Sequence, residues 1–173
     1  MSMYQIFETE RLLIQPTTED DAVFLFELMN NPKWIKNIGD RNVKSVEDAK
    51  VYVQNKITPQ LEKLGYSSYT VIRKSDGVKL GVCGLYDRDG VDGIDIGFAF
   101  LPQFEKKGYA FEAASELKDK AVNVFNISQI SAITTSDNIE SQKLLKKIGF
   151  GFVSLTKIPH DVEELLLYRF LSL

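Results

Sequence analysis

The hydrophobic period of this chain changes abruptly after residue 100, and that change limits the folds open to it. The segment Gly93–Phe100 alternates as a strand does, which places Asp95 on the face opposite a row of apolar side chains: Ile94, Ile96, Phe98 and Phe100. From Ala110 to Val124 the apolar residues instead recur every three to four positions, which predicts a helix of about four turns. Another apolar strand, Ser128–Thr135, follows. A strand–helix–strand unit of this kind excludes both an all-α and an all-β fold.

The rest of the chain predicts further elements around this unit. Apolar runs bounded by turn residues indicate strands at 11–14, 68–72, 78–85, 150–155 and 165–171. Helical spacing indicates helices at 18–29, 45–64 and 139–148. Pro32 would end the first of these helices, Pro59 would kink the second, and Gly65 would end it. No linker or repeat divides the chain, so the expected fold class is α+β, a mixed α/β sheet in one domain over residues 1–173.

Composition excludes several classes of protein. With 173 residues, 44% of them hydrophobic and 26% charged, the chain has the make-up of a globular domain. Its apolar runs are shorter than the ~20 residues of a membrane span, and its first residues lack the pattern of a signal peptide. A net charge of −3 argues against a nucleic-acid surface. The single cysteine, Cys83, and the single histidine, His160, argue against an internal disulfide and a histidine-rich metal site. We therefore expect a cytoplasmic protein that uses no metal.

The junction between the central strand and the long helix is a candidate anion site. Two lysines and a glycine, Lys106, Lys107 and Gly108, immediately precede the helix. Unpaired N–H groups and the positive end of the helix dipole meet at such a junction. Gly108 would let the backbone approach a phosphate closely. The local pattern also fits an ordinary strand-to-helix turn with two solvated lysines.

A second candidate segment follows the next strand. Asn138 precedes a short helix that has Ser141 in its first turn and Gly149 at its end. Capping of that helix is the simplest role for Asn138. However, ligands gather at the carboxyl ends of strands in sheets with helical crossovers. The two segments together therefore predict one ligand site.

Several short motifs occur in one order along the chain. They are Thr9-Glu-Arg-Leu12, Pro16, Asp20-Asp-Ala22, Ile96-Gly-Phe-x-Phe-x-Pro102, Lys107-Gly-Tyr-Ala110, Glu112-Ala113, Asn138-x-x-Ser141 and Leu145-x-Lys-x-Gly-Phe150. This order resembles the GNAT superfamily of acetyl-CoA-dependent N-acetyltransferases, and specifically its RimJ/RimL-like branch. The resemblance spans nearly the whole chain. It implies a central mixed, mostly antiparallel sheet of six to seven strands flanked by four helices.

The resemblance also implies where acetyl-CoA would bind. The pantetheine arm would lie along the strand and share backbone hydrogen bonds with Phe98, Ala99 and Phe100. The pyrophosphate would lie on the N–H groups of a loop made of Glu105, Lys106, Lys107, Gly108, Tyr109 and Ala110. Asn138 matches the asparagine that hydrogen-bonds the pantetheine in the family. Ser141 would lie near the thioester sulfur.

Two departures from the family pattern bear on this site. The loop of this branch usually reads W-G-K-G, whereas Lys106 replaces its first glycine here. We expect the loop to tolerate this residue if Lys106 keeps a negative φ. The tyrosine that many members carry seven residues after the asparagine is Leu145 here. Ser141 then becomes the candidate acid for the leaving thiolate.

The reaction implied by the resemblance requires a neutral amine. A lysine amine with a pKa of ~10.4 is neutral in roughly one molecule in 2,500 at pH 7, so a general base matters for such an acceptor. Asp95 stands where relatives often place a glutamate, and it is the candidate base; a solvated strand carboxylate is its alternative role. The backbone N–H of Phe98 is the candidate donor to the developing oxyanion.

The expected function is direct acetyl transfer from acetyl-CoA to a primary amine, either a protein N-terminus or a small molecule. The expected enzyme is a monomer or homodimer without nucleic-acid or membrane partners. Two alternatives stay open. One is a non-catalytic acyl-CoA-binding or sensor domain, and the other is an anion-binding or structural domain that shares only the fold.

Overall fold

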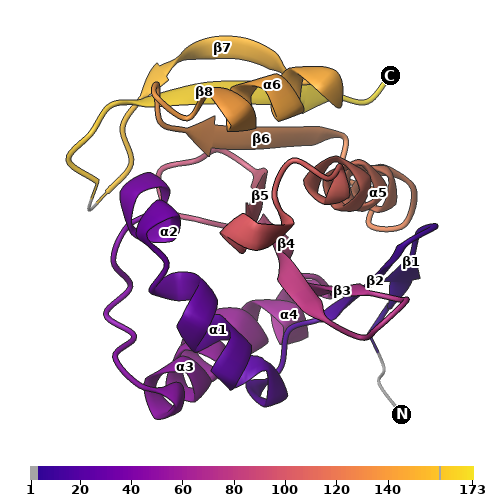
Figure 1. The fold of residues 1–173 in the computed structure, drawn as a ribbon. Helices are drawn as coiled ribbons and strands as arrows, with labels where there is room; N and C mark the ends of the chain where they lie inside the picture. The colour runs from indigo at the N-terminus through magenta and orange to yellow at the C-terminus, as the bar shows by residue number, and fades with distance from the viewer. Residues whose placement is uncertain (1–3, 160) are drawn as a thin grey trace.

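The computed structural model describes residues 4–159 and 161–173, whose strands form one mixed sheet (Figure 1). The eight strands of these residues are β1 (Phe7–Glu8), β2 (Leu12–Pro16), β3 (Ser68–Arg73), β4 (Lys79–Tyr86), β5 (Ile94–Phe100), β6 (Gln129–Thr134), β7 (Gly151–Thr156) and β8 (Leu165–Leu171). Their order in the sheet is β1-β2-β3-β4-β5-β6-β8-β7. Only β5 and β6 pair in parallel among them. His160 lies outside the described residues.

The fold class is the expected one, but the sheet is larger than six to seven strands. The additional strand is β1, which contributes two residue pairs with β2. A segment of two residues is too short to show an alternation of apolar and polar side chains, so sequence periodicity does not detect it.

Six α-helices occur in the described residues: α1 (Ala22–Met29), α2 (Pro32–Asn37), α3 (Val46–Tyr52), α4 (Thr58–Leu64), α5 (Tyr109–Asn123) and α6 (Ile139–Lys147). The expected number was four. Pro32 follows α1, as predicted, but it also begins α2, where Asn31 caps the helix by accepting a hydrogen bond from the Lys33 N–H. The second predicted helix is divided into α3 and α4 by a π-helical turn over Val53–Ile57, just before Pro59. Short 3₁₀ turns cover Glu19–Asp21 and Pro102–Phe104.

Two hydrophobic clusters lie on the two faces of the sheet. One contains Ile96 and Cys83 and packs against α5 and α6, and burial raises the pKa of the Cys83 thiol to about 12. The other contains Val82 and packs against α1, α3 and the π-helical turn. Figure 1 shows α1 to α4 gathered together, apart from α5. None of the helices described is both long enough and apolar enough to cross a bilayer.

The sheet opens between β5 and β6. β5 pairs with β4 from Asp95 to Phe100, but it pairs with β6 only at Ile94 and Asp95. The Leu101 N–H donates to the Leu80 carbonyl at 3.0 Å, on the β4 side. Because N–H direction alternates along a strand, the N–H groups of Phe98 and Phe100 point away from β4, toward this opening.

Candidate active site

The opening between β5 and β6 has two lips, which are the loops that follow these strands. The lip after β5 carries Lys106, the lip after β6 leads to Glu140, and the Lys106 ammonium lies 4.0 Å from the Glu140 carboxylate. Both segments singled out in the sequence therefore come together at the mouth of the opening. Helix α2 also contacts both lips. Lys33 donates to the Glu105 carboxylate, and Lys36 lies 3.4 Å from the Asp137 carboxylate.

The lip after β5 ends at an uncapped helix N-terminus. Gly108 is the N-cap residue of α5, with a left-handed φ of +82°, and no side chain caps the first turn. By contrast, Asn31, Ser45 and Asn138 supply side-chain caps to α2, α3 and α6. The first N–H groups of α5 are thus left for an external acceptor, and the helix dipole favours an anionic one.

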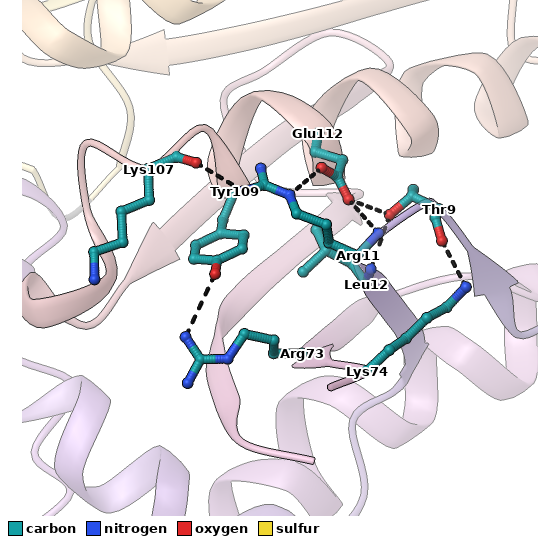
Figure 2. A network of polar contacts seen from close by, with 8 residues as sticks. All are labelled: Thr9, Arg11, Leu12, Arg73, Lys74, Lys107, Tyr109 and Glu112. Atoms are coloured by element: carbon teal, nitrogen blue, oxygen red, sulfur yellow. Dashed lines mark hydrogen bonds and ion pairs between the residues drawn. The ribbon is translucent and has the colours of Figure 1, made fainter. Parts of the chain in front are cut away.

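Arg11 holds this lip from outside (Figure 2). Its Nη1 donates to the Lys107 carbonyl at 3.0 Å, and its Nε donates to Glu112 Oε1 at 2.8 Å. Its guanidinium also stacks on the Tyr109 ring, 4.3 Å from the centroid. A Cβ at position 108 would lie 3.2 Å from Arg11 Nη2, a tight contact that adds to the preference of the left-handed φ for glycine. The motif Thr9-Glu-Arg-Leu12 therefore positions the start of α5.

Glu112, in the first turn of α5, points its carboxylate into this network. Burial would raise its pKa, but hydrogen bonds from the Thr9 hydroxyl and from Arg11 outweigh that effect and hold the pKa below its usual value. The Thr9 hydroxyl lies 2.5 Å from Glu112 Oε2. The only carboxylate in the first turn of α5 is thereby neutralised locally by Arg11. The Glu112 carboxylate, paired with Arg11, therefore does not repel an anion bound at the N-terminus of α5.

Lys106 does not meet the condition of a negative φ. Its φ is +61°, in the left-handed region, and not negative. The loop thus has at Lys106 a backbone conformation that glycine adopts without strain. For a residue with a Cβ, such as lysine, this left-handed conformation has a higher steric energy than the usual negative φ.

The lip after β6 places Asn138 and Ser141 in the first turn of α6. The Asn138 Oδ1 accepts a hydrogen bond from the Ser141 N–H at 3.3 Å, so Asn138 caps the helix, which was the simplest role open to it. Both residues are partly buried. No hydrogen bond engages the Ser141 hydroxyl within the described part of the chain, which leaves that group available to a ligand.

Asp95 lies where β5 and β6 part. Its side chain is 1% exposed, and its Oδ2 accepts a hydrogen bond from Arg88 Nε at 2.5 Å. The alternative role as a solvated strand carboxylate is therefore wrong, because Tyr86 and Ser131 flank Asp95 in register and Arg88 pairs with it. Burial raises the pKa of Asp95, against the opposing attraction of Arg88. Its second oxygen, Oδ1, is buried without a hydrogen-bond partner.

Four residues near Asp95 were not found from the sequence: Tyr86, Arg88, Ser131 and Arg169. The Tyr86 ring lies against Gly84 and Gly97, since Cβ atoms there would approach it to 2.4 Å and 3.1 Å. Arg88 could have been found from the sequence, because it lies between the predicted strands 78–85 and 93–100, and a hairpin of these strands brings positions 88 and 95 together. Ser131 and Arg169 carry no local signal, since their placement depends on strand register.

Comparison with known proteins identifies the family. The profile of the Acetyltransferase (GNAT) domain family matches residues 11–151. This chain belongs to the GNAT acetyltransferase family. The acetyltransferase is 30% identical to YnaD of Bacillus subtilis, an uncharacterised N-acetyltransferase, over 82% of this chain and 79% of the relative.

Solved structures share the fold of this acetyltransferase. An acetyltransferase of the GNAT family from Bacillus anthracis superposes with a TM-score of 0.79 at 25% identity, over 96% of this chain and 98% of the other. RimL, a ribosomal L7/L12 N-acetyltransferase solved with coenzyme A, superposes with a TM-score of 0.81 at 17% identity, over 97% and 98% of the two chains. The RimJ/RimL-like resemblance seen in the motifs therefore extends to the fold.

Proposed function

We propose that this acetyltransferase transfers the acetyl group of acetyl-CoA directly to a primary amine, of a protein N-terminus or of a small molecule. The observation that carries the proposal is the unpaired edge of β5, which opens beside the uncapped N-terminus of α5. An extended amide chain that ends in a pyrophosphate matches this pair of features, because a strand edge binds amides and a helix N-terminus binds phosphate.

The residues around the opening fit acetyl-CoA. The backbone of Phe98, Ala99 and Phe100 would pair with the pantetheine amides. The segment from Glu105 to Ala110 would hold the pyrophosphate with its N–H groups, and Lys106 and Lys107 would add positive charge. Asn138 would bind the pantetheine through its side-chain amide, while its Oδ1 caps α6. When bound, acetyl-CoA supplies an activated acyl group as a thioester.

The residues of the chain would position the two reactants and move protons. The amine nitrogen bonds to the acetyl carbon, and the carbon–sulfur bond breaks. Asp95 Oδ1, which is buried and unpartnered, would accept the proton that the amine gives up. The Phe98 N–H would donate to the carbonyl oxygen as charge develops on it. The Ser141 hydroxyl would donate to the departing sulfur. Alignment of the two reactants supplies a large share of the rate in such a transfer.

Thermal melting with ligands tests the binding site. Desulfo-CoA or acetyl-CoA at about one hundred times its Kd adds ~2.7 kcal/mol to the stability of the folded state, a Tm increase of about 5 to 10 °C for a domain of this size. ATP, which lacks the pantetheine arm, should have a smaller effect. Gly108→Trp and Asn138→Ala should reduce the shift with the CoA compounds.

Gly77→Trp is the matched control, because Gly77 also has a left-handed φ, of +74°, but lies in the turn between β3 and β4, where a Cβ would contact nothing within 4 Å. It should lower Tm without changing the ligand shift. Absence of any shift with CoA compounds in the wild type would refute the proposed binding site. Binding of acetyl-CoA without transfer to any amine would instead indicate an acyl-CoA-binding protein.

A further inference from the structure

A row of polar side chains crosses the sheet where β5 and β6 part. Asp95 on β5 stands in register with Ser131 on β6, and Ser131 stands in register with Arg169 on β8. Residues in register on neighbouring strands point to the same face of a sheet. We call Asp95, Ser131 and Arg169 the polar row. Its face is the one opposite Ile96 and Ile130, which belong to the core beneath α5.

Each member of the polar row has an unsatisfied polar atom. Asp95 Oδ1, Ser131 Oγ and Arg169 Nε are all buried without a hydrogen-bond partner. Asp95 and Ser131 are each 1% exposed. Since a buried polar group without a partner lowers stability, three such atoms on adjacent strands indicate a place where a ligand supplies the missing hydrogen bonds. Asp95 Oδ1 needs a hydrogen-bond donor, and Arg169 Nε needs an acceptor.

The charge around the polar row is positive. Arg88 neutralises Asp95, whereas Arg169 has no carboxylate within 4.0 Å among the residues that the structure describes. Arg88 and Arg169 are both partly exposed, whereas Asp95 and Ser131 are buried. A polyamine would meet two arginines and one neutralised carboxylate. An amine that also bears an anionic group would complement the same residues.

We propose that the polar row is the acceptor subsite and selects primary amines that carry a carboxylate close to the amine. The inference rests on the proposed function. The amine would donate to Asp95 Oδ1, and the carboxylate would accept hydrogen bonds from Ser131 Oγ and Arg169. Strands lie about 4.8 Å apart, so amine and carboxylate must be separated by only a few bonds. A free amino acid and a peptide N-terminus with an acidic first side chain both have this chemistry.

Matched acceptor pairs test the selectivity. One pair is a free amino acid and its carboxamide, and the other is two short peptides that differ only in Asp or Asn at the first position. Spermidine serves as a polycationic acceptor. After correction for the fraction of neutral amine at the assay pH, we expect kcat/KM to favour the carboxylate member by tenfold or more. The pair with the larger ratio distinguishes a free amino acid from a peptide as the source.

Variants assign that selectivity to the arginine. Arg169→Met should raise the KM of carboxylate acceptors about ten- to a hundredfold and bring the ratio within each pair close to one, because a charge-assisted hydrogen bond is lost. The KM of acetyl-CoA should not change, and Arg169→Lys should recover part of the selectivity. Arg41→Met, at an exposed arginine on the loop before α3, is the matched control and should leave the ratios unchanged.

Two results would overturn the inference while leaving the proposed function intact. One is acetylation of carboxamides and spermidine as efficient as that of carboxylates. The other is a carboxylate preference that persists in Arg169→Met. Failure of the wild type to bind acetyl-CoA or to acetylate any amine defeats the proposed function itself, and is recognised without reference to Arg169.

Discussion

Lys106 holds a left-handed backbone conformation that suits glycine better than lysine. Its φ is +61°, and the ion pair of its side chain with Glu140 is long and exposed. Exposed ion pairs contribute about 0–1 kcal/mol, whereas a non-glycine residue in this region costs roughly 1 kcal/mol or more. The lysine therefore adds positive charge to the lip after β5 at the expense of stability.

Lys106→Gly should raise the free energy of unfolding by about 1 kcal/mol and Tm by about 2–4 °C. Lys107→Gly is the control, because Lys107 is not among the residues with a positive φ, and the extra backbone freedom should leave stability unchanged or lower it. Calorimetry of both variants measures the difference. Equal effects at the two positions would show that backbone strain at Lys106 is not the cause.

Arg11→Met should weaken CoA binding through the phosphate end of the ligand. Without its hydrogen bond to the Lys107 carbonyl, the lip after β5 loses the contact that orients it toward α5. On the proposed function, the Kd of CoA should rise about tenfold, while the Kd of pantetheine, which has no pyrophosphate, should hardly change. Calorimetric titration with both ligands measures this. Equal weakening for the two ligands would mean that Arg11 acts only on overall folding.

For single residues, the sequence was informative where the role of a residue depends only on its neighbours in the chain. Gly108 and the cap at Asn138 could be placed because each depends on the residues next to it. The burial of Asp95 could not, because alternation alone placed this side chain on the face opposite the apolar row. Its burial depends on β6 lying alongside β5, which no local pattern encodes.

The first turn of α5 is tied to the segment between β1 and β2 by one carboxylate. Glu112 accepts hydrogen bonds from the Thr9 hydroxyl, the Arg11 backbone N–H and the Arg11 guanidinium. These bonds lower its pKa, so their contribution to stability is fully present above the unfolded-state pKa of about 4.3 and is lost as the pH falls through the lower folded-state value. The helix and the first strands are thus held together by an acid-sensitive contact.

Glu112→Gln should lower the free energy of unfolding by about 1–3 kcal/mol at pH 7. The gap between wild type and variant should narrow as the pH falls below about 4, because the wild-type carboxyl group becomes neutral as well. Urea unfolding at several pH values measures it. Glu116→Gln, which removes an ion pair with Lys120 one turn further along the same helix, should change stability by about 0.5 kcal/mol or less. A gap that stays constant down to pH 3 would contradict the assignment.

Elements with a long, regular period were predictable and short ones were not. The helix after Gly108 and the alternating strand before it appear as expected, since each repeats its pattern several times. Helix α2 has six residues and begins at Pro32. This proline was interpreted only as the end of the preceding helix, so the start of α2 was missed. The π-helical turn before Pro59 extends a helical pattern without interrupting its spacing.

One edge of the sheet, formed by β7, is unprotected. This strand has no charged residue, and Phe152, Val153 and Leu155 are exposed on it. Natural edge strands usually carry a charge, a proline or a cover that prevents pairing with other chains. The edge is therefore the first place where copies of this protein should associate at high concentration.

Leu155→Lys should reduce self-association without impairing the site, because it adds a gatekeeping charge to the edge. Light scattering over a range of protein concentrations measures the change, with acetyl-CoA binding as the check on folding. Val23→Lys is the control, since Val23 is also exposed but lies on α1, away from the edge. Equal loss of association in both variants would point to net charge instead of the edge.

At the scale of the whole molecule, the fold class was predicted from the sequence, whereas the register of the strands was not. The strand–helix–strand unit was predicted, and its two strands form the parallel pair of β5 and β6 inside the mixed, mostly antiparallel sheet that the family resemblance implied. The polar row could not be foreseen, because Ser131 and Arg169 meet only when β6 pairs with β8 at a particular register. Sites assembled across strands distant in the chain carry no signal within any one of those strands.

The separation of β5 from β6 also has a mechanical consequence. With two residue pairs at the junction, the sheet behaves as a five-stranded and a three-stranded half joined by a short seam. A pantetheine chain hydrogen-bonded to β5 on one side and to Asn138 on the other would act as a temporary strand and lengthen that seam. Acetyl-CoA should then slow amide hydrogen exchange at Phe98 and Phe100, and also in β6 and β8, which lie in the other half. Protection confined to β5 would mean that the ligand fills the opening without stiffening the protein across it.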